Sequence, residues 1–308
     1  MKIVILGGTG LIGRGLTASL AADGHEVVVV SRSPERVQGL PIGARAAGWD
    51  ARTAEGWGAE VDGADALVNF AGASVKGEGF LPSRWTAKRK RLIRESRMNA
   101  GLALVEAVQG AQRKPGVVIQ ASAVGYYGPR REEEVGEDGG MGDDFLAQVC
   151  AEWEASSQAV EAMGVRRCVV RTGLVLTNAG GAFPLLKLPF YFFAGGPFGS
   201  GRQYYPWIHY TDEIRALRFL IKNQQADGPF NLTAPNPLPN KEFARALGKA
   251  LRRPSWLSAP AFAMKLALGE VSTVVLDGQR AIPAALQGAG FTFEYPHLDG
   301  ALTELVRT

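Results

Sequence analysis

The feature that most constrains the fold is the passage from an apolar run to three regularly spaced glycines at the start of the chain. Residues 3–6 read Ile-Val-Ile-Leu, and Gly7, Gly10 and Gly13 follow before a helical pattern begins. The run indicates a buried strand, after which Gly7 permits a tight turn, Gly10 lets phosphates approach the backbone and Gly13 lets the helix pack closely. Because free N–H groups at a helix start attract anions, this order predicts a dinucleotide-binding turn.

Further apolar runs alternate with helical patterns through about the first 175 residues; they occupy residues 27–30, 44–47, 66–70, 117–120 and 168–171. Apolar strands separated by helices are typical of a parallel sheet that is covered on both faces. We therefore expect an α/β fold with a doubly wound parallel sheet. A Rossmann domain is expected over residues 1–175 and a smaller C-terminal lobe over residues 176–308. Glycine, proline and aromatic residues crowd residues 180–207, which we expect to be irregular.

Composition excludes several classes of function. The 308 residues carry a net charge of +4, with 46% hydrophobic and 21% charged residues, as in soluble globular proteins. That charge is too small to argue for nucleic acid. Two cysteines fit a reducing cytoplasm and give neither a disulfide framework nor a metal spacing. The most apolar stretch, residues 183–193, is too short to span a membrane. We expect a cytoplasmic protein without nucleic-acid, membrane or metal partners; a homodimer stays open.

The end of the second strand predicts which dinucleotide binds. The chain there reads Val30-Ser31-Arg32, with no acidic residue to accept a hydrogen bond from a ribose 2′-hydroxyl. Serine and arginine instead supply donors and positive charge for a 2′-phosphate, which favours NADP(H). A solvent-facing arginine is the alternative for Arg32. Asp50, after the third strand, is expected either to accept from the adenine amino group or to cap the next helix.

Two later segments extend the expected cofactor site. The fourth strand ends in Asn69-Phe70-Ala71-Gly72, where small residues let the cofactor lie against the chain. Arg97 falls on the apolar stripe of the long helix that follows, so its guanidinium is expected to point inward. A buried arginine needs an anion or acceptors, and a cofactor ribose or phosphate is a candidate. The expected cofactor contacts are Gly7, Thr9, Gly10, Leu11, Ile12, Gly13, Ser31, Arg32, Asp50, Phe70, Ala71, Gly72 and Arg97.

The fifth strand runs into residues that carry hydroxyl groups. Ser122 stands near its end, and Tyr126 and Tyr127 follow directly. Their hydroxyls are expected near a bound nicotinamide, which makes Ser122 and Tyr126 the candidate acid–base pair. Tyrosines that only pack a turn are the alternative. The acidic residues 132–138 are expected to form a solvated loop or a mobile lid.

Several motifs carry a resemblance to a known family. GGTGLIG, NFAG, ASAVGYYG, VVRTGLVL and YPWIHYTDEI stand in the order typical of extended short-chain dehydrogenase/reductases, which the chain resembles over nearly its whole length. WTAKRKRLIRESR, CAEWE, GGPFGSGRQYYPWIH and LDGQRAIPAALQGAGF make it similar to the atypical branch called epimerase family proteins. The resemblance implies a nicotinamide cofactor, with residues 172–175, Val175 included, along its nicotinamide end.

The chain also departs from that superfamily. The superfamily's acid–base tyrosine, and the lysine four residues later that lowers its pKa and holds the nicotinamide ribose, correspond to Leu146 and Cys150. Members of the superfamily usually carry an arginine for a nucleotide-sugar phosphate a few residues before the histidine at position 209. In this chain Tyr205 stands nearest to that position, and Arg202 falls earlier. The sequence therefore predicts an NADP(H)-binding oxidoreductase or epimerase-like protein with an unidentified small-molecule substrate. A non-catalytic NADP(H)-binding sensor or scaffold is the alternative.

Overall fold

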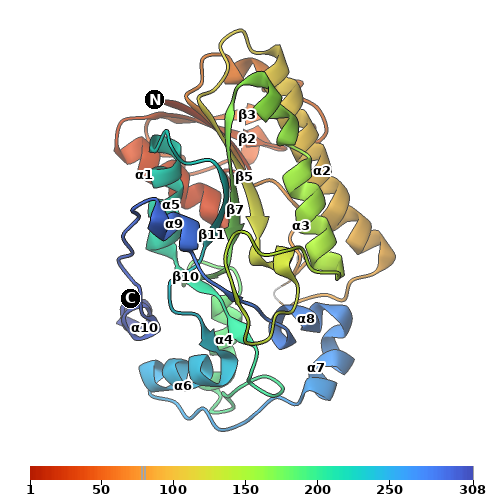
Figure 1. Cartoon of the computed structure of the whole chain (residues 1–308), viewed down its shortest axis with the longest axis vertical. Coiled ribbons are helices and arrows are strands. Elements are labelled where there is room, and N and C mark those ends of the chain that lie inside the picture. Colours follow the sequence, from red (N-terminus) through yellow and green to blue (C-terminus); the bar gives the residue numbers. More distant parts are fainter. Residues whose placement is uncertain (78, 80, 308) are drawn as a thin grey trace.

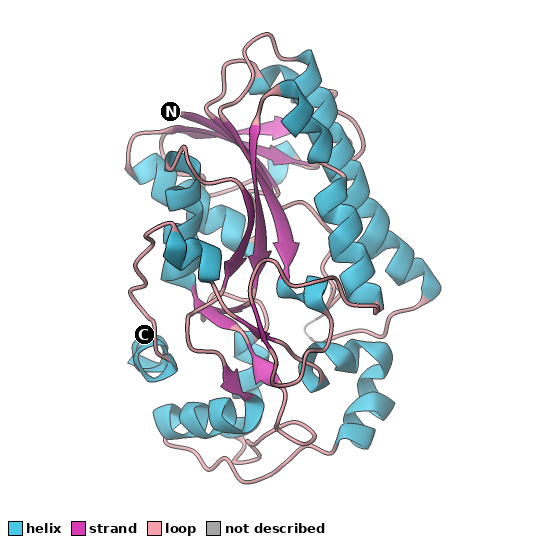
Figure 2. Cartoon of the chain, viewed as in Figure 1, coloured by secondary structure: helices cyan, strands magenta, loops and turns pink. Residues whose placement is uncertain are grey.

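The central element of the computed structural model, which describes residues 1–77, 79 and 81–307, is a sheet of seven parallel strands (Figures 1 and 2). Its strand order is β11-β7-β5-β4-β1-β2-β3. The strands are β1 (Lys2–Leu6), β2 (Glu26–Ser31), β3 (Ala44–Gly48), β4 (Ala66–Asn69), β5 (Val117–Ala123), β7 (Arg166–Thr172) and β11 (Gly228–Leu232). The chain runs outward from β1 to β3 and returns beside β1 with β4. The expected doubly wound sheet is confirmed, and its order reverses at the β1–β4 boundary, where such sheets bind ligands.

Successive side chains of the central strands pack under different helices. Ile3 and Ile5 of β1 share an apolar core with α1 (Leu11–Ala22) and α5 (Tyr210–Lys222). Val4 and Leu6 of the same strand belong to a second core with α2 (Ala87–Gly110). Because neighbouring strand residues point to opposite faces, both faces of the sheet are apolar and both are covered. Figure 1 shows α1 and α5 on one side of the sheet and α2 with α3 (Phe145–Ala155) on the other.

A smaller lobe with its own apolar core lies beyond the carboxyl ends of the strands, in the lower half of Figure 1. Its paired strands are β8 (Leu174–Leu176) with β10 (Trp207–His209) and β9 (Tyr204–Tyr205) with β12 (Leu238–Pro239). Its helices include α4 (Phe183–Tyr191), α6 (Asn240–Leu251) and α10 (Leu298–Arg307). Helix α4 corrects the expectation of irregular structure over residues 180–207. Pro184 stands in its first turn, where a missing N–H costs little.

The C-terminal part of the chain returns to the main sheet and also covers its end. β11 forms an edge of the central sheet, although it follows residue 175 by more than fifty positions. The remaining strands and α-helices are β6 (Glu134–Val135), paired with β13 (Arg280–Ala281), and α7 (Ala261–Leu268), α8 (Thr273–Leu276) and α9 (Ala284–Gly288). Within the described ranges, none of the helices is long and apolar enough to cross a membrane.

Candidate functional site

The turn between β1 and α1 is closed too tightly to hold side chains. Gly7 has a φ of 77°, and the Gly10 N–H donates to the Gly7 carbonyl oxygen at 2.9 Å. A Cβ at Gly13 would lie 2.4 Å from that same oxygen, and a Cβ at Gly7 would lie 2.9 Å from the carbonyl carbon of Phe70. No side chain among the described residues caps α1 at Gly10. The first N–H groups of α1, beside Thr9, Leu11 and Ile12, therefore stay available to an anion.

A cavity of about 520 Å³, here called the β2 cavity, opens beside the glycine turn. Its lining includes Gly8, Thr9, Arg14, Ser31, Ser33 and Arg36. Two guanidinium groups, of Arg14 in α1 and of Arg36 after β2, make this a place where a phosphate is favoured. Arg32 is exposed and does not line the cavity. Sequence reasoning missed Arg14 and Arg36; their positions one turn into α1 and just after β2 were the available signal.

Hydrogen bonds fix the loops after β3 and β4. The carboxylate of Asp50 accepts from the Thr53 N–H at 2.8 Å and the Thr53 hydroxyl at 2.9 Å, and bonds from the Thr53 backbone lower the pKa of Asp50. These contacts close a local turn and cap no helix, because the next helical segment, Gly58–Val61, has Trp57 at its N-cap. After β4 the Ala71 N–H donates to Asn69 Oδ1 at 3.1 Å. This bond fixes the turn after β4, and the Phe70 backbone lies directly beside Gly7.

A second cavity, here called the inner cavity, has a volume of about 340 Å³ and lies where β5 and β7 end against α3 and the smaller lobe. Most of its wall is apolar and includes Leu146, Val149, Trp153, Leu174, Leu186 and Val275. Its charged lining residues, within the part of the chain that the structure describes, are Arg97, Asp144 and Asp277. Val175 lies in β8, paired with Ile208, next to the lining residue Leu174.

The inner cavity contains the two positions where the superfamily implies a tyrosine and a lysine. Leu146 and Cys150 both line it. Leu146 has no proton to give, and burial raises the pKa of the Cys150 thiol to about 11, so the thiol is neutral at neutral pH. Partial burial and the neighbouring Asp144 charge raise the pKa of Asp277. Asp277 is a lining carboxyl that sequence reasoning missed, although it stands in the motif LDGQRAIPAALQGAGF.

Ser122 and Tyr126 lie beside the inner cavity and not in its wall. Ala123 lines the cavity, whereas Ser122, its neighbour on β5, points toward α3, where its hydroxyl forms a hydrogen bond with the cavity-lining Cys150 thiol. The Ser122 hydroxyl donates to Glu154 Oε1 at 2.6 Å. The Tyr126 ring packs on a guanidinium, with Arg171 Cζ 3.6 Å from the ring centroid. The Ser122 hydroxyl and the Tyr126 ring therefore both contact the buried Arg171–Glu154 ion pair, and their acid–base role stays a prediction.

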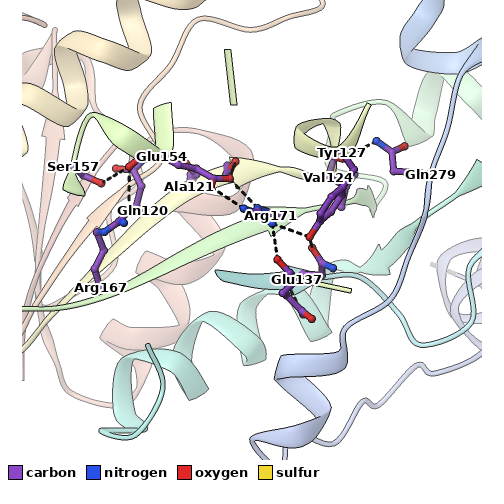
Figure 3. Close-up of polar contacts among 12 residues, drawn as sticks. Gln120, Ala121, Val124, Tyr127, Glu137, Glu154, Ser157, Arg167, Arg171 and Gln279 are labelled. Atoms are coloured by element: carbon purple, nitrogen blue, oxygen red, sulfur yellow. Dashed lines mark hydrogen bonds and ion pairs between the residues drawn. The ribbon is translucent and has the colours of Figure 1, made fainter. Parts of the chain in front are cut away.

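That ion pair is the centre of a polar cluster shown in Figure 3. Arg171 donates from Nε to Glu154 Oε1 and from Nη2 to Glu154 Oε2, both at 2.9 Å. Its Nη1 donates to the Tyr127 hydroxyl at 3.0 Å, and that hydroxyl donates to Asn231 Oδ1 at 2.7 Å. Burial lowers the pKa of Arg171, but the hydrogen bonds and charge of Glu154 outweigh this, and the net shift is upward.

The cluster also fastens the acidic segment that sequence analysis treated as a solvated loop or lid. The Glu137 carboxylate accepts from the Asn231 N–H at 2.9 Å and the Ala285 N–H at 3.0 Å. Val135 is buried in β6. In Figure 3, Gln279 reaches over from the C-terminal segment, and its amide donates to the Val124 carbonyl at 2.7 Å. Glu132, Glu133, Glu134 and Asp138 are exposed, as in a solvated loop, whereas Val135 and Glu137 anchor the end of the segment.

Arg97 lies between the loop after β4 and helix α3. Its Nη1 donates to the carbonyl oxygens of Ala73 at 3.0 Å and Ile93 at 2.8 Å, and its Cζ lies 4.7 Å from the centroid of the Trp153 ring. Burial lowers the pKa of Arg97 to about 10, so the guanidinium stays charged at neutral pH. None of the described carboxylates pairs with it. The residue points inward, as its place on the apolar stripe predicts.

Comparison with known proteins assigns this arrangement to a family. Residues 3–233 match the NAD dependent epimerase/dehydratase family, and residues 259–305 match a domain of unknown function, DUF1731. The chain belongs to the NAD dependent epimerase/dehydratase family. It is 38% identical over 315 residues to the epimerase family protein YfhF of Bacillus subtilis, an alignment that covers 99% of this chain and 98% of that protein. The expected membership among epimerase family proteins is confirmed.

Solved structures of family members share the fold. A crystal structure of the human epimerase family protein SDR39U1 (isoform 2) with NADPH has a TM-score of 0.89 and 33% identity and covers 100% of both chains. A nucleoside-diphosphate sugar epimerase from Corynebacterium glutamicum has a TM-score of 0.77 and 32% identity over 99% of this chain and 58% of that one. In our chain, the DUF1731 segment contributes Asp277 and Gln279 to the wall of the inner cavity.

Proposed function

We propose that the protein binds NADP(H) across the carboxyl ends of β1, β2, β4 and β5. The glycine turn carries this proposal, because a Cβ at Gly13 would meet the Gly7 carbonyl oxygen at 2.4 Å and only a bare backbone lets α1 start there. Its N–H groups are suited to a pyrophosphate. The human relative crystallised with NADPH supports the same cofactor. When bound, NADP(H) donates or accepts a hydride.

The 2′-phosphate of NADP(H) would occupy the β2 cavity. Arg14 and Arg36 line it, and Ser31 adds a hydroxyl group. Arg32 stands in the sequence between two lining residues, Ser31 and Ser33. Glu35 lies near Arg36, with the carboxylate 3.6 Å from Nε, so part of the charge of Arg36 is compensated. Donors from several side chains are expected to favour the phosphorylated cofactor over NAD(H).

The substrate proposed for the inner cavity is an apolar carbonyl compound or alcohol. Leucine, valine and tryptophan side chains make up much of the wall, and two carboxylates, Asp144 and Asp277, line one part of it. Carboxylates repel a nucleoside diphosphate, and the one cation in the described wall, Arg97, is itself an expected cofactor contact. An apolar molecule, in contrast, gains free energy from every part that it buries.

A second candidate is a non-catalytic NADP(H) sensor. One observation favours it: the positions of the superfamily's tyrosine and lysine hold Leu146 and Cys150, and Ser122 is bound to Glu154. Turnover separates the two candidates. Sustained NADPH oxidation with any member of a panel of apolar aldehydes and ketones supports the enzyme, whereas tight cofactor binding without turnover across that panel supports the sensor.

Calorimetric titration tests the cofactor assignment. We expect the protein to bind NADPH at least about tenfold more tightly than NADH, since charge-assisted bonds to the 2′-phosphate contribute about 1.5–3 kcal/mol. Arg32→Ala and Arg36→Ala should each weaken NADPH and leave NADH nearly unchanged, with a preference that shrinks as salt rises. Arg245→Ala, on an exposed part of α6, is the matched control. Equal affinities for the two cofactors in the unmodified protein would contradict the proposal.

A further inference from the structure

We propose that the end of the molecule formed by the smaller lobe and α7 docks on a membrane surface that contains anionic phospholipids. The surface concerned, here called the lobe-end patch, consists of residues 191–193, where α4 ends, residues 252–257, in the loop after α6, and helix α7. The inference does not depend on the proposed cofactor. It revises the expectation of no membrane partner, which considered only segments long enough to span a bilayer.

The first observation is the exposure of large apolar side chains. The exposed fraction is 74% for Phe192, 72% for Trp256 and 75% for Phe262. The exposed phenylalanine, tryptophan and tyrosine side chains of the described structure all lie in the lobe-end patch; they are Tyr191, Phe192, Phe193, Trp256 and Phe262. Because water solvates apolar surface unfavourably, such a concentration indicates a surface that contacts an apolar phase.

Backbone contacts join the segments of the patch. The Leu257 N–H donates to the Gly195 carbonyl oxygen at 3.1 Å, and the Ala259 N–H donates to the Pro197 carbonyl oxygen at 3.0 Å. The loop after α6 therefore runs beside the chain that leaves α4, and α7 begins at Ala261. In Figure 1 this loop follows the lower end of the molecule from α6 to α7. The exposed side chains thus belong to one end of the molecule.

Helix α7 is the most apolar part of the patch. Its sequence is AFAMKLAL, and none of its residues is buried. Phe262 and Leu266, which is 73% exposed, stand four positions apart and therefore on one face of the helix. Packing against the protein does not explain an apolar helix whose residues stay accessible. A helix of this kind gains free energy at the boundary between lipid headgroups and acyl chains.

The second observation is the sign of the charges around the patch. Residues 183–209 and 243–269 contain no aspartate or glutamate, whereas Lys187, Arg252, Arg253 and Lys265 lie within them. Arg253 Cζ lies 4.8 Å from the centroid of the Phe193 ring, so a cation and an exposed aromatic ring stand together. Glu270, the next acid after α7, pairs with Lys90 of α2. The patch is therefore suited to an anionic partner.

Exposed aromatic rings together with cations favour a membrane over other occupants. A second copy docked by two-fold symmetry would bring the same cations against each other, and these repel. A single-stranded nucleic acid needs a cationic groove with rings for base stacking, whereas α7 offers aliphatic side chains and one lysine. An anionic membrane surface accepts both kinds of group, because apolar side chains enter the interface while lysine and arginine attract the headgroups.

The patch lies next to the inner cavity. Leu186 of α4 and Val274 of α8 line that cavity, and Val274 is also exposed. The charge of Lys265 in α7 acts on the pKa of Asp277, another lining residue. Docking at this end therefore places the cavity beside the phase in which apolar molecules dissolve. This consequence, unlike the docking itself, rests on the apolar substrate proposed above.

Sedimentation of the full chain with lipid vesicles tests the docking. We expect binding to vesicles of phosphatidylglycerol and phosphatidylcholine in equal parts to be at least about tenfold tighter than to vesicles of phosphatidylcholine alone. The difference should shrink as salt rises. Arg252→Gln combined with Lys265→Gln should reduce this preference. The same vesicles should shift the tryptophan emission of the unmodified protein to shorter wavelength, and Trp256→Phe should remove that shift.

The apolar contribution is tested on two exposed side chains of α7. Phe262→Ser combined with Leu266→Ser should weaken binding to the mixed vesicles at least about tenfold, since less apolar area leaves water. Leu102→Ser, which changes an exposed leucine of α2, is the matched control and should leave vesicle binding unchanged. If the α7 variant does not fold, Phe192→Ser combined with Trp256→Ser tests the same surface.

Several outcomes overturn the proposal. These are no vesicle binding, equal binding to the two kinds of vesicle, and unchanged binding in the variants of the patch. A dimer that dissociates in the α7 variant would assign the patch to a second copy, and a single-stranded oligonucleotide that binds where vesicles do not would assign it to nucleic acid. None of these measurements requires NADP(H), so a failure here leaves the cofactor proposal standing, and a failure of cofactor binding leaves this one standing.

Discussion

Two inward-pointing arginines, the buried Arg171 and the partly buried Arg97, differ in what compensates their charge. Arg171 is bound through two nitrogens to Glu154, with 5% and 14% of the two side chains exposed, and it also donates to Tyr127. Within the described structure, Arg97 donates to two backbone carbonyl oxygens and packs on an indole ring, and no carboxylate pairs with it. The contrast appears in the pKa values: burial lowers that of Arg97, whereas Glu154 more than offsets burial at Arg171.

The difference separates a cation that holds the fold together from one that is available to a ligand. A paired buried charge has already found its anion, so a ligand gains little from it. An unpaired guanidinium cannot neutralise itself by losing its proton at neutral pH. It therefore favours any anion that reaches the inner cavity, and this is the physical reason to connect Arg97 with binding and Arg171 with stability.

The largest expected effect tests that separation directly. Arg171→Met leaves Glu154 buried without its cation and should lower the free energy of unfolding by about 3–5 kcal/mol. Arg97→Met removes a charge that burial already disfavours and should change it by no more than about 1 kcal/mol. Urea denaturation of both variants without cofactor gives the two values. Equal losses would mean that Arg97 is also a structural residue.

Much of the sheet and one half of the candidate site could be predicted from the sequence. The strands of the first 175 residues are short apolar runs, and such a run is visible in the sequence without knowledge of distant contacts. The predicted runs coincide with strands of the central sheet. The glycine turn is equally local, because Gly7, Gly10 and Gly13 lie within seven residues. Such features need no knowledge of what the rest of the chain packs against.

The inner cavity could not be predicted in the same way. Neighbouring residues of a strand point to opposite faces, so a shift of one residue decides which side chain of β5 lines the cavity. In the structure Ala123 lines it, whereas the Ser122 hydroxyl donates to Glu154. Asp277 and Gln279 reach the site from more than a hundred residues away. Helix α4 forms despite two prolines, because tertiary packing of Phe183 and Phe190 outweighs local preference.

The buried carboxyl group of Glu213 extends the comparison, because no cation among the described residues pairs with it. Glu213 of α5 is fully buried; one carboxylate oxygen accepts from the Thr172 hydroxyl at 3.0 Å, and the other has no partner in the described structure. Burial raises the pKa of Glu213 from 4.5 to about 8. Unlike Arg97, this group can become neutral at pH 7 by keeping its proton.

A pH dependence of stability follows from that raised pKa. Between about pH 4.5 and 8, Glu213 is ionised in the unfolded chain and protonated in the folded protein. The stability that this difference contributes is therefore complete below about pH 4.5 and is lost as the pH rises toward 8. The loss approaches about 1.4 kcal/mol per pH unit. Glu213→Gln, which can still accept from Thr172, should remove this slope. Denaturation at pH 6 and pH 7 measures it; identical slopes in the two proteins would mean that Glu213 is ionised.

The smallest expected effect concerns Ser122, which sequence analysis assigned to catalysis. If its hydroxyl serves only the Arg171–Glu154 pair, Ser122→Ala should lower the free energy of unfolding by about 1 kcal/mol, since Arg171 still satisfies the same carboxylate oxygen. NADPH affinity and any turnover found with the carbonyl panel should stay within about twofold of the unmodified protein, because Ala123 and not Ser122 lines the inner cavity. Denaturation and calorimetry on one preparation give both values. A drop in turnover of about a hundredfold with unchanged stability would return Ser122 to the acid–base role and show that the cavity wall rearranges when cofactor binds.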